Sequence, residues 1–196
     1  MSRWNFSDTL HPYLVEPARS TQESVHLGIL DSSAQSIVYV DAIECARPIR
    51  YSAPIGCTRP LHSTAGGRIL LAFAKPRSAA SYLRGLRSAD PARGTAEAQR
   101  LIHDELVEIR TANFSMNLQE AASEFGSVAA PIFGVNGNCV AAIAVSAPVG
   151  ELIRRLEELR GLVQGVAQRA SAPARHLPQD DVTSSVTTPA RSKTTA

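Results

Sequence analysis

Apolar side chains recur with helical spacing in several segments of the chain. The cleanest pattern covers residues 150–170, where apolar residues three or four positions apart form a single stripe, as on the buried side of a surface helix. Residues 97–110 show the same period, and shorter helices are predicted over 8–19, 63–74 and 77–86. The stripe of the last helix consists of Leu152, Leu156, Leu159, Val163, Val166 and Ala170.

Two segments rich in β-branched and aromatic residues follow one another in the first quarter of the chain. Residues 24–30 and 36–44 are separated by a short polar turn, so we expect them to pair as a β-hairpin. The alternating segment 49–53 suggests a third strand near them.

A second hairpin is predicted from residues 127–133 and 139–146. Asn136 and Gly137 between them form a dipeptide that is typical of tight hairpin turns. The strand 139–146 is apolar on both faces, which favours a central position covered by helices. Pro131 cannot donate a backbone hydrogen bond, so it indicates a bulge or an edge position.

The order of these elements predicts an α+β domain with one sheet, in which two antiparallel hairpins flank the helices. Residues 1–19 are expected to carry a short N-terminal helix, and residues 20–170 to form the domain. Residues 171–196 are rich in Ser, Thr, Pro and Ala, which predicts a disordered tail. No dinucleotide-binding or phosphate-binding glycine motif is present in the sequence.

Composition and charge exclude several classes of protein. Hydrophobic residues make up 44% of the chain, enough for a core, and a net charge of +2 gives no argument for direct nucleic-acid binding. Three widely spaced cysteines argue for a reducing compartment. No apolar run is long enough to span a bilayer, and the first residues lack a signal-peptide core. We therefore expect a cytoplasmic protein without a membrane partner.

The segment Arg59–Arg68 carries the most suggestive local chemistry. Turn-forming Pro60 leads to the hydroxyl residues Ser63 and Thr64, which stand where a helix N-cap belongs, and small residues follow at 65–67. A helix N-terminus has unpaired N–H groups and partial positive charge, so it attracts anions. Two interpretations are open: an anion site, or a capped core helix whose glycines allow close packing.

Taken together, the motifs resemble the C-terminal effector-binding domain of the IclR family of bacterial transcription regulators. The match is colinear over about residues 8–170 and includes the Pro-Leu-His segment before the helix start. It rests on four segments: Ser20–Asp31; Val38–Glu44 followed by Arg47–Arg50; Gly56–Leu71; and Gly126–Phe133, continuing through Asn136 and Gly137 to Ala141–Ser146.

This resemblance implies a GAF-like (profilin-like) fold that senses a small organic, typically carboxylic, acid. It implies a homodimer or tetramer, and operator DNA bound only through an N-terminal winged helix-turn-helix domain. Nothing before Ser20 matches such a domain, and the chain is expected to start within the linker helix. A truncation, a misassigned start and a shortened chain would all explain this, and the motifs imply neither a particular acid nor a choice between activation and repression.

The resemblance also implies an effector site with two walls. Ala65 and Gly66 take the positions whose backbone N–H groups face a carboxylate. Asn117 stands where the family often has Asp, and an amide can donate as well as accept, which favours a ligand rich in acceptors. Ser127 and Ser146 add hydroxyl groups; the alternative for all three polar residues is bonding to local backbone.

Further residues are expected to line this pocket: His26, Thr64, Val128 and Ala129. His26 replaces the family's usual Asn, and a core position is the alternative for it. Arg68, where the family usually has Lys, is expected to form a surface salt bridge.

An enzyme is the competing hypothesis. Cys45 or Cys57 with His62 would be the nucleophile and base of a small cytoplasmic hydrolase. No local signature supports this pairing, and His62 is instead expected to orient its loop by bonding a backbone carbonyl. The histidines and cysteines also lack the spacing of a zinc site, so no catalytic residue, metal or cofactor is predicted.

Overall fold

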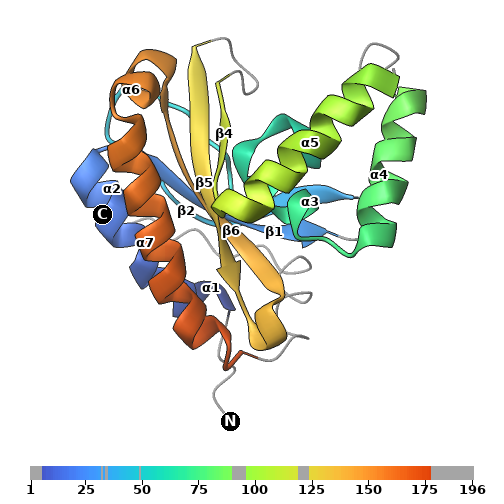
Figure 1. Cartoon of the computed structure of the whole chain (residues 1–196). Coiled ribbons are helices and arrows are strands. Elements are labelled where there is room, and N and C mark those ends of the chain that lie inside the picture. Colours follow the sequence, from blue (N-terminus) through green and yellow to red (C-terminus); the bar gives the residue numbers. More distant parts are fainter. Residues whose placement is uncertain are drawn as a thin grey trace.

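One antiparallel sheet organises the molecule, with helices on both of its faces (Figure 1). The computed structural model describes residues 6–31, 33, 35–48, 50–89, 96–118 and 124–177. Within them, six strands lie in the order β3-β2-β1-β6-β5-β4, and every described strand pair is antiparallel. The predicted α+β class with a single sheet is confirmed. The strands are β1 (Ser24–Asp31), β2 (Ser36–Ile43), β3 (Thr58–Pro60), β4 (Ser115–Asn117), β5 (Phe125–Phe133) and β6 (Cys139–Pro148).

Both predicted hairpins form, β1–β2 and β5–β6. In the turn between β5 and β6, η2 (Val135–Gly137), Asn136 and Gly137 have φ angles of 58° and 73°. Two successive positive φ angles are what a tight hairpin turn requires, and Asn and Gly adopt them at little cost.

The central position predicted for β6 is also confirmed, since β6 pairs with β1 on one side and β5 on the other. Pro131 faces Ala142 on β6, but the described pairing of β5 with β4 stops at Ala129. Pro131 therefore lies where β5 forms a local edge, as predicted, and its missing N–H costs no ladder bond there.

The third strand predicted at 49–53 is wrong. The edge of β2 is taken by a later part of the chain: Gly56 N–H donates to Tyr39 O at 2.7 Å, and Tyr39 N–H donates to Cys57 O at 3.1 Å. Strand β3 then continues this pairing, with Ser36 opposite Pro60. Gly56 makes the turn with a φ of +87°, which other residues rarely adopt.

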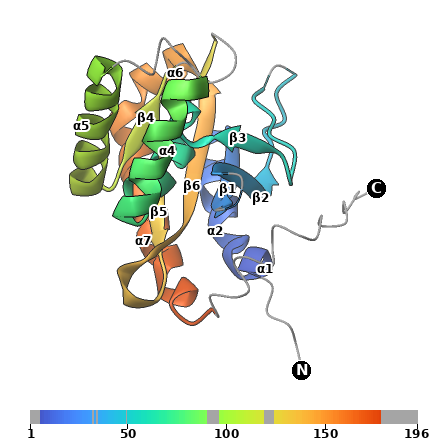
Figure 2. The same ribbon diagram turned by 90° about the vertical axis from the view of Figure 1, so that its right-hand side faces the viewer.

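The helices divide between the two faces of the sheet (Figures 1 and 2). We name the faces after one helix on each, the α7 face and the α3 face. The α7 face carries α1 (Phe6–Leu10), α2 (Pro12–Thr21), α6 (Val149–Arg154) and α7 (Leu156–Ala174). The α3 face carries the turn η1 (Leu61–Ser63), α3 (Ala65–Ala72), α4 (Pro76–Ala89) and α5 (Ala96–Ala112).

Helices at both ends of the described chain pack on the same core. Within residues 6–19, Phe6, Leu10 and Leu14 are fully buried with residues of α7. The last helix breaks at Arg155 (φ −112°) and continues past the expected limit of 170 to Ala174, with Ser171 buried. The other residues of the predicted tail, 178–196, lie outside the described residues.

Candidate functional site

The start of α3 is built by a side-chain cap. Thr64 has extended backbone (φ −130°), and its hydroxyl accepts a hydrogen bond from Gly67 N–H at 2.9 Å. A side chain on Gly67 would place its Cβ 2.4 Å from Leu61 O, so only glycine fits there. The backbone N–H groups of Ala65 and Gly66 lie at the positive end of the helix. Thr64 is predicted to line the pocket, but its hydroxyl serves the helix.

Close packing brings this helix start onto the sheet. A Cβ added to Gly66 would lie 3.1 Å from Ile37 Cδ1 and 3.6 Å from Ala142 Cβ. Ala65 is completely buried. These small residues therefore allow close packing, and this packing places the helix terminus directly over β6 and its neighbours.

The second predicted wall is tied to the first by one bond. Asn117 Nδ2 donates to Ser63 O at 2.6 Å, so the end of β4 is attached to the turn that leads into α3. Because an amide donates this bond, a carboxylate at the same position would lack it. Since Ser63 lies at β4 and Gly66 lies over Ala142 of β6, the chain crosses the sheet between them.

Polar residues on four strands align in one row beneath this crossing. Asn117 is opposite Ser127, Ser127 is opposite Ser146, and Ser146 is opposite Ser24. Directly paired residues point to the same side of a sheet, so this serine row faces α3 throughout. Three predicted effector residues thus come together, and Ser24, which the sequence did not single out, completes the row. Its hydroxyl accepts from Cys45 N–H at 3.1 Å.

A second row lies next to the first on the same face. Ser115 is opposite Ala129, Ala129 is opposite Ala144, and Ala144 is opposite His26. Both ends of this alanine row are polar and buried, and among the described residues neither Ser115 Oγ nor either ring nitrogen of His26 has a hydrogen-bond partner. Ala129, which was predicted to line the pocket, therefore lies in this row between Ser115 and His26.

His26 is 1% exposed and sits among aromatic rings, as the core alternative expected. The rings of Tyr39 and Tyr51 lie edge-on at centroid distances of 5.5 Å each. Burial lowers the pKa of His26 to about 4, against a smaller opposing effect of the Glu44 carboxylate. The imidazole is therefore neutral at pH 7, with one donor and one acceptor nitrogen.

Val128 is not part of this region, contrary to the prediction. Alternation along β5 turns its side chain away from Ser127 and Ala129 and into the core of the α7 face, where it is fully buried. Val128 was predicted to line the pocket because it lies between Ser127 and Ala129 in the sequence. Successive side chains of a strand point to opposite faces, so it cannot share their face.

The basic and histidine side chains near the helix start hold it in place. Arg68 pairs with Glu105 of α5 at 2.5 Å and donates from Nε to His62 O at 2.9 Å. The predicted salt bridge is thus present, although it is partly buried. His62 Nδ1 lies 2.7 Å from the Tyr82 hydroxyl of α4, which anchors the His62 turn to that helix.

The thiols do not support the hydrolase hypothesis. Burial raises the pKa of the Cys57 thiol, and it raises the pKa of Cys139 to about 12. A thiol must ionise to act as a nucleophile, and His62, the proposed base, is held by Tyr82. No group of metal-binding side chains was found within the described part of the chain.

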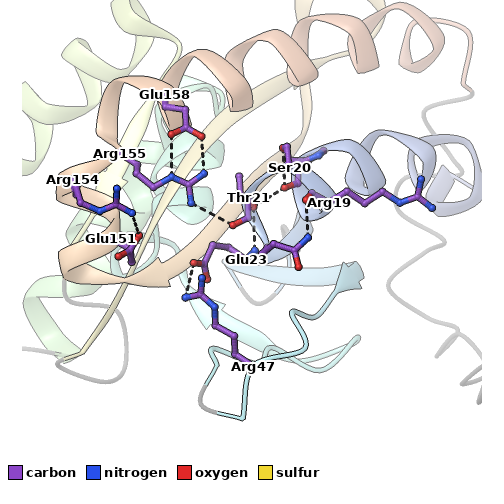
Figure 3. Close-up of polar contacts among 11 residues, drawn as sticks. Arg19, Ser20, Thr21, Glu23, Arg47, Glu151, Arg154, Arg155 and Glu158 are labelled. Atoms are coloured by element: carbon purple, nitrogen blue, oxygen red, sulfur yellow. Dashed lines mark hydrogen bonds and ion pairs between the residues drawn. The ribbon is translucent and has the colours of Figure 1, made fainter.

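A charged cluster around buried Glu23, which the sequence did not single out, joins α2, β1 and α6–α7 (Figure 3). Glu23 is 2% exposed and pairs with Arg47 at 2.9 Å, and burial raises its pKa. Arg155 pairs with Glu158 at 2.6 Å and donates to Thr21 O at 3.3 Å. Through Arg47, the loop that follows β2 is paired with Glu23, next to the start of β1.

Two open cavities lie apart from the serine and alanine rows. One of about 260 Å³ and one of about 510 Å³ share Gln35 and Tyr82, between the β2–β3 edge and α4. None of the predicted effector residues lines either of them. The first is bordered by Arg77 and the second by Arg59.

Comparison with known proteins agrees with this architecture. Residues 1–172 match the family model described as the bacterial transcriptional regulator IclR C-terminal domain. The acetate operon repressor of Salmonella typhimurium is 27% identical over 170 residues, which are 85% of this chain and 61% of the relative. The chain spans less than two thirds of the length of the curated relatives it matches. No described helix is long and apolar enough to cross a membrane.

Solved structures give the same result. The IclR protein of Thermotoga maritima superposes with a TM-score of 0.77 at 27% identity, covering 88% of this chain and 70% of that one. An IclR homologue from Microbacterium hydrocarbonoxydans, complexed with 4-hydroxybenzoate, has a TM-score of 0.74 at 17% identity, with coverages of 88% and 69%. The predicted GAF-like fold is confirmed.

Proposed function

Because this chain belongs to the IclR family of bacterial transcriptional regulators, we propose that it is the ligand-sensing and oligomerisation domain of such a regulator. It binds a small organic acid and assembles as a dimer or tetramer. Operator DNA is contacted by a separate winged helix-turn-helix domain of the assembled regulator. Since its target is the chromosome of a bacterium, it works in the cytoplasm.

The observation that carries this proposal is the hydrogen bond by which Asn117, at the end of the serine row, holds the turn that leads into α3. Backbone N–H groups at a helix N-terminus favour an anion. Hydroxyl groups of Ser127 and Ser146 lie on the sheet below and can donate to carboxylate oxygens. Small residues at 65 and 66 bring the backbone within reach of a ligand, and the site is buried enough for each polar contact to count.

A thermal-shift screen of the whole chain tests the proposal. The probes are small mono- and dicarboxylic acids, and benzoate and 4-hydroxybenzoate, since a structural neighbour was crystallised with the latter. Each acid is paired with its primary amide, which has nearly the same shape without the charge. A ligand at about 100 times its Kd stabilises a protein by about 2.7 kcal/mol, which raises the Tm of a chain of this size by several degrees.

Two serine variants locate the binding. Ser127→Ala should lower the affinity for a stabilising acid by about tenfold, because a hydrogen bond to a charged group contributes about 1.5–3 kcal/mol. Ser78→Ala, at an exposed position of α4, should leave affinity unchanged. Equal stabilisation by acids and amides, or equal binding by the two variants, would contradict an anion site at the serine row.

A further inference from the structure

We propose that the effector is a hydroxy acid, and that His26 is the residue that selects it by hydrogen bonding to the hydroxyl. This rests on the proposed function, in which the carboxylate lies at the start of α3. His26 then contacts the other end of the same small molecule. Ser115 Oγ, at the opposite end of the alanine row, is a second uncharged partner on this face.

The first argument is that His26 is buried without a partner. It is 1% exposed, and among the described residues neither ring nitrogen has a hydrogen bond. Leaving a buried polar group unsatisfied costs about 1–3 kcal/mol, so native proteins rarely do so without a reason. A ligand that completes these bonds would recover that free energy when it binds, which makes the residue a natural point of selection.

The second argument is the small size of the residues around His26 on the sheet. Its direct neighbours across the strands are Ala42 and Ala144, and the next residues on the same face of β1 are Ser24 and Gly28. The larger side chains here are Tyr39 and Tyr51, which lie against the ring, and Ile37, which lies over Gly28. Between His26 and the serine row, this face of the sheet presents the small side chains of Ala144 and Ser24.

The third argument is distance. Gly66 lies directly above Ala142, with only 3.6 Å between its would-be Cβ and the Ala142 Cβ. Because His26 is opposite Ala144, it is the diagonal neighbour of Ala142, and such diagonal pairs are about 7–8 Å apart. A carboxylate at the helix start and a hydroxyl at His26 are thus separated by roughly the length of one aromatic ring or a short carbon chain.

The chemistry of this end favours a hydroxyl over a second carboxylate. A neutral imidazole offers one donor and one acceptor, and a hydroxyl group is likewise both donor and acceptor. A carboxylate could only accept, so it would leave the acceptor nitrogen of the ring without a donor. Monocarboxylic hydroxy acids therefore fit this face better than dicarboxylic acids.

Matched ligand pairs and three variants of the whole chain test the inference by calorimetry. The pairs are benzoate with 4-hydroxybenzoate and propanoate with 3-hydroxypropanoate, and succinate is the dicarboxylic probe. In the native chain, at least one hydroxy acid should bind about tenfold more tightly than its parent, and more tightly than succinate. His26→Leu should reduce the ratio to about one, whereas His26→Gln, which keeps a donor and an acceptor, should retain most of it.

His103→Gln is the matched control, because His103 is exposed on α5 and should not affect the ratio. In addition, the ¹⁵N signals of the His26 ring should shift with the hydroxy acid and not with its parent. Acids that bind without any preference for the hydroxyl, or a preference that survives in His26→Leu, would overturn this inference and leave the proposed function standing. If no acid of any pair binds, both are refuted.

Discussion

Buried His26 should make the stability of this domain depend on pH in a way that a single variant can isolate. The folded state lowers the pKa of His26 to about 4 from an ordinary value of 6.5. Between these values the unfolded chain binds a proton that the folded chain does not, so the free energy of unfolding falls as the pH falls. Above pH 6.5 the ring is neutral in both states, and its contribution is constant.

The size of the effect follows from the interval between the two pKa values. At about 1.4 kcal/mol per pH unit, an interval of about 2.5 pH units corresponds to about 3 kcal/mol at pH 4 and below. The groups around the ring do not cancel this. Tyr39 and Tyr51 are uncharged in this range, and Glu44 opposes the shift only in part.

Urea denaturation of the native chain and His26→Gln at pH 7.5, 6.5, 5.5 and 4.5 measures the effect. Other groups titrate in this range in both proteins, so the informative quantity is the difference between their free energies of unfolding. Relative to the native chain, the variant should gain about 2.5 kcal/mol as the pH falls across this range, while His103→Gln should follow the native chain. A difference that stays constant with pH would mean that water or a partner satisfies the His26 ring, and would refute the reasoning.

Three further predictions concern the elements that build the site. Gly67→Ala should destabilise the fold by about 2 kcal/mol, because its Cβ would lie 2.4 Å from Leu61 O. Gly66→Ala should cost less than about 1 kcal/mol, since its Cβ would lie 3.1 Å from the movable Ile37 side chain. Equal urea midpoints for the two variants would contradict the packing of α3. Asn117→Ala should cost about 1–3 kcal/mol by leaving Ser63 O without its donor, and an unchanged midpoint would show that the bond is dispensable. Arg47→Met should destabilise the chain by about 2 kcal/mol by stranding buried Glu23, and adding Glu23→Gln should restore much of the loss; denaturation of the single and double variants that showed no recovery would refute the pairing.

The sequence predicted most of the local structure, because its signals are local. Asn136-Gly137 and the flanking β-branched runs specify a hairpin, and the apolar spacing of α7 specifies a helix. Residues 49–53 were misleading because Tyr51 and Ala53 are both buried although they lie in a loop. Their spacing of two therefore looks like the alternation of a strand. Which segment takes the edge of β2 is decided by the turn at Gly56, which no pattern of alternation reveals.

Part of the site was also predictable, because some of its features depend on local sequence. Capping by Thr64 follows from residue types, and the resemblance supplied Asn117, Ser127 and Ser146. Their alignment with Ser24 depends on strand register, which the sequence of a single strand does not contain. Whether His26 has a partner is a property of the packed interior, so residue type alone left both alternatives open.

The connection between α2 and β1 gives the domain a mechanical property. Helix α2 ends at Gln22 in a left-handed conformation, Glu23 is fixed by Arg47, and Ser24 already belongs to the serine row. Leu14 also packs against α7, so the connection from α2 to β1 is rigid. We therefore expect α2 to move together with β1 as one rigid unit when a ligand binds next to the serine row. Spin-label distances between α2 and α5 would detect this movement, and identical distances with and without ligand would exclude it.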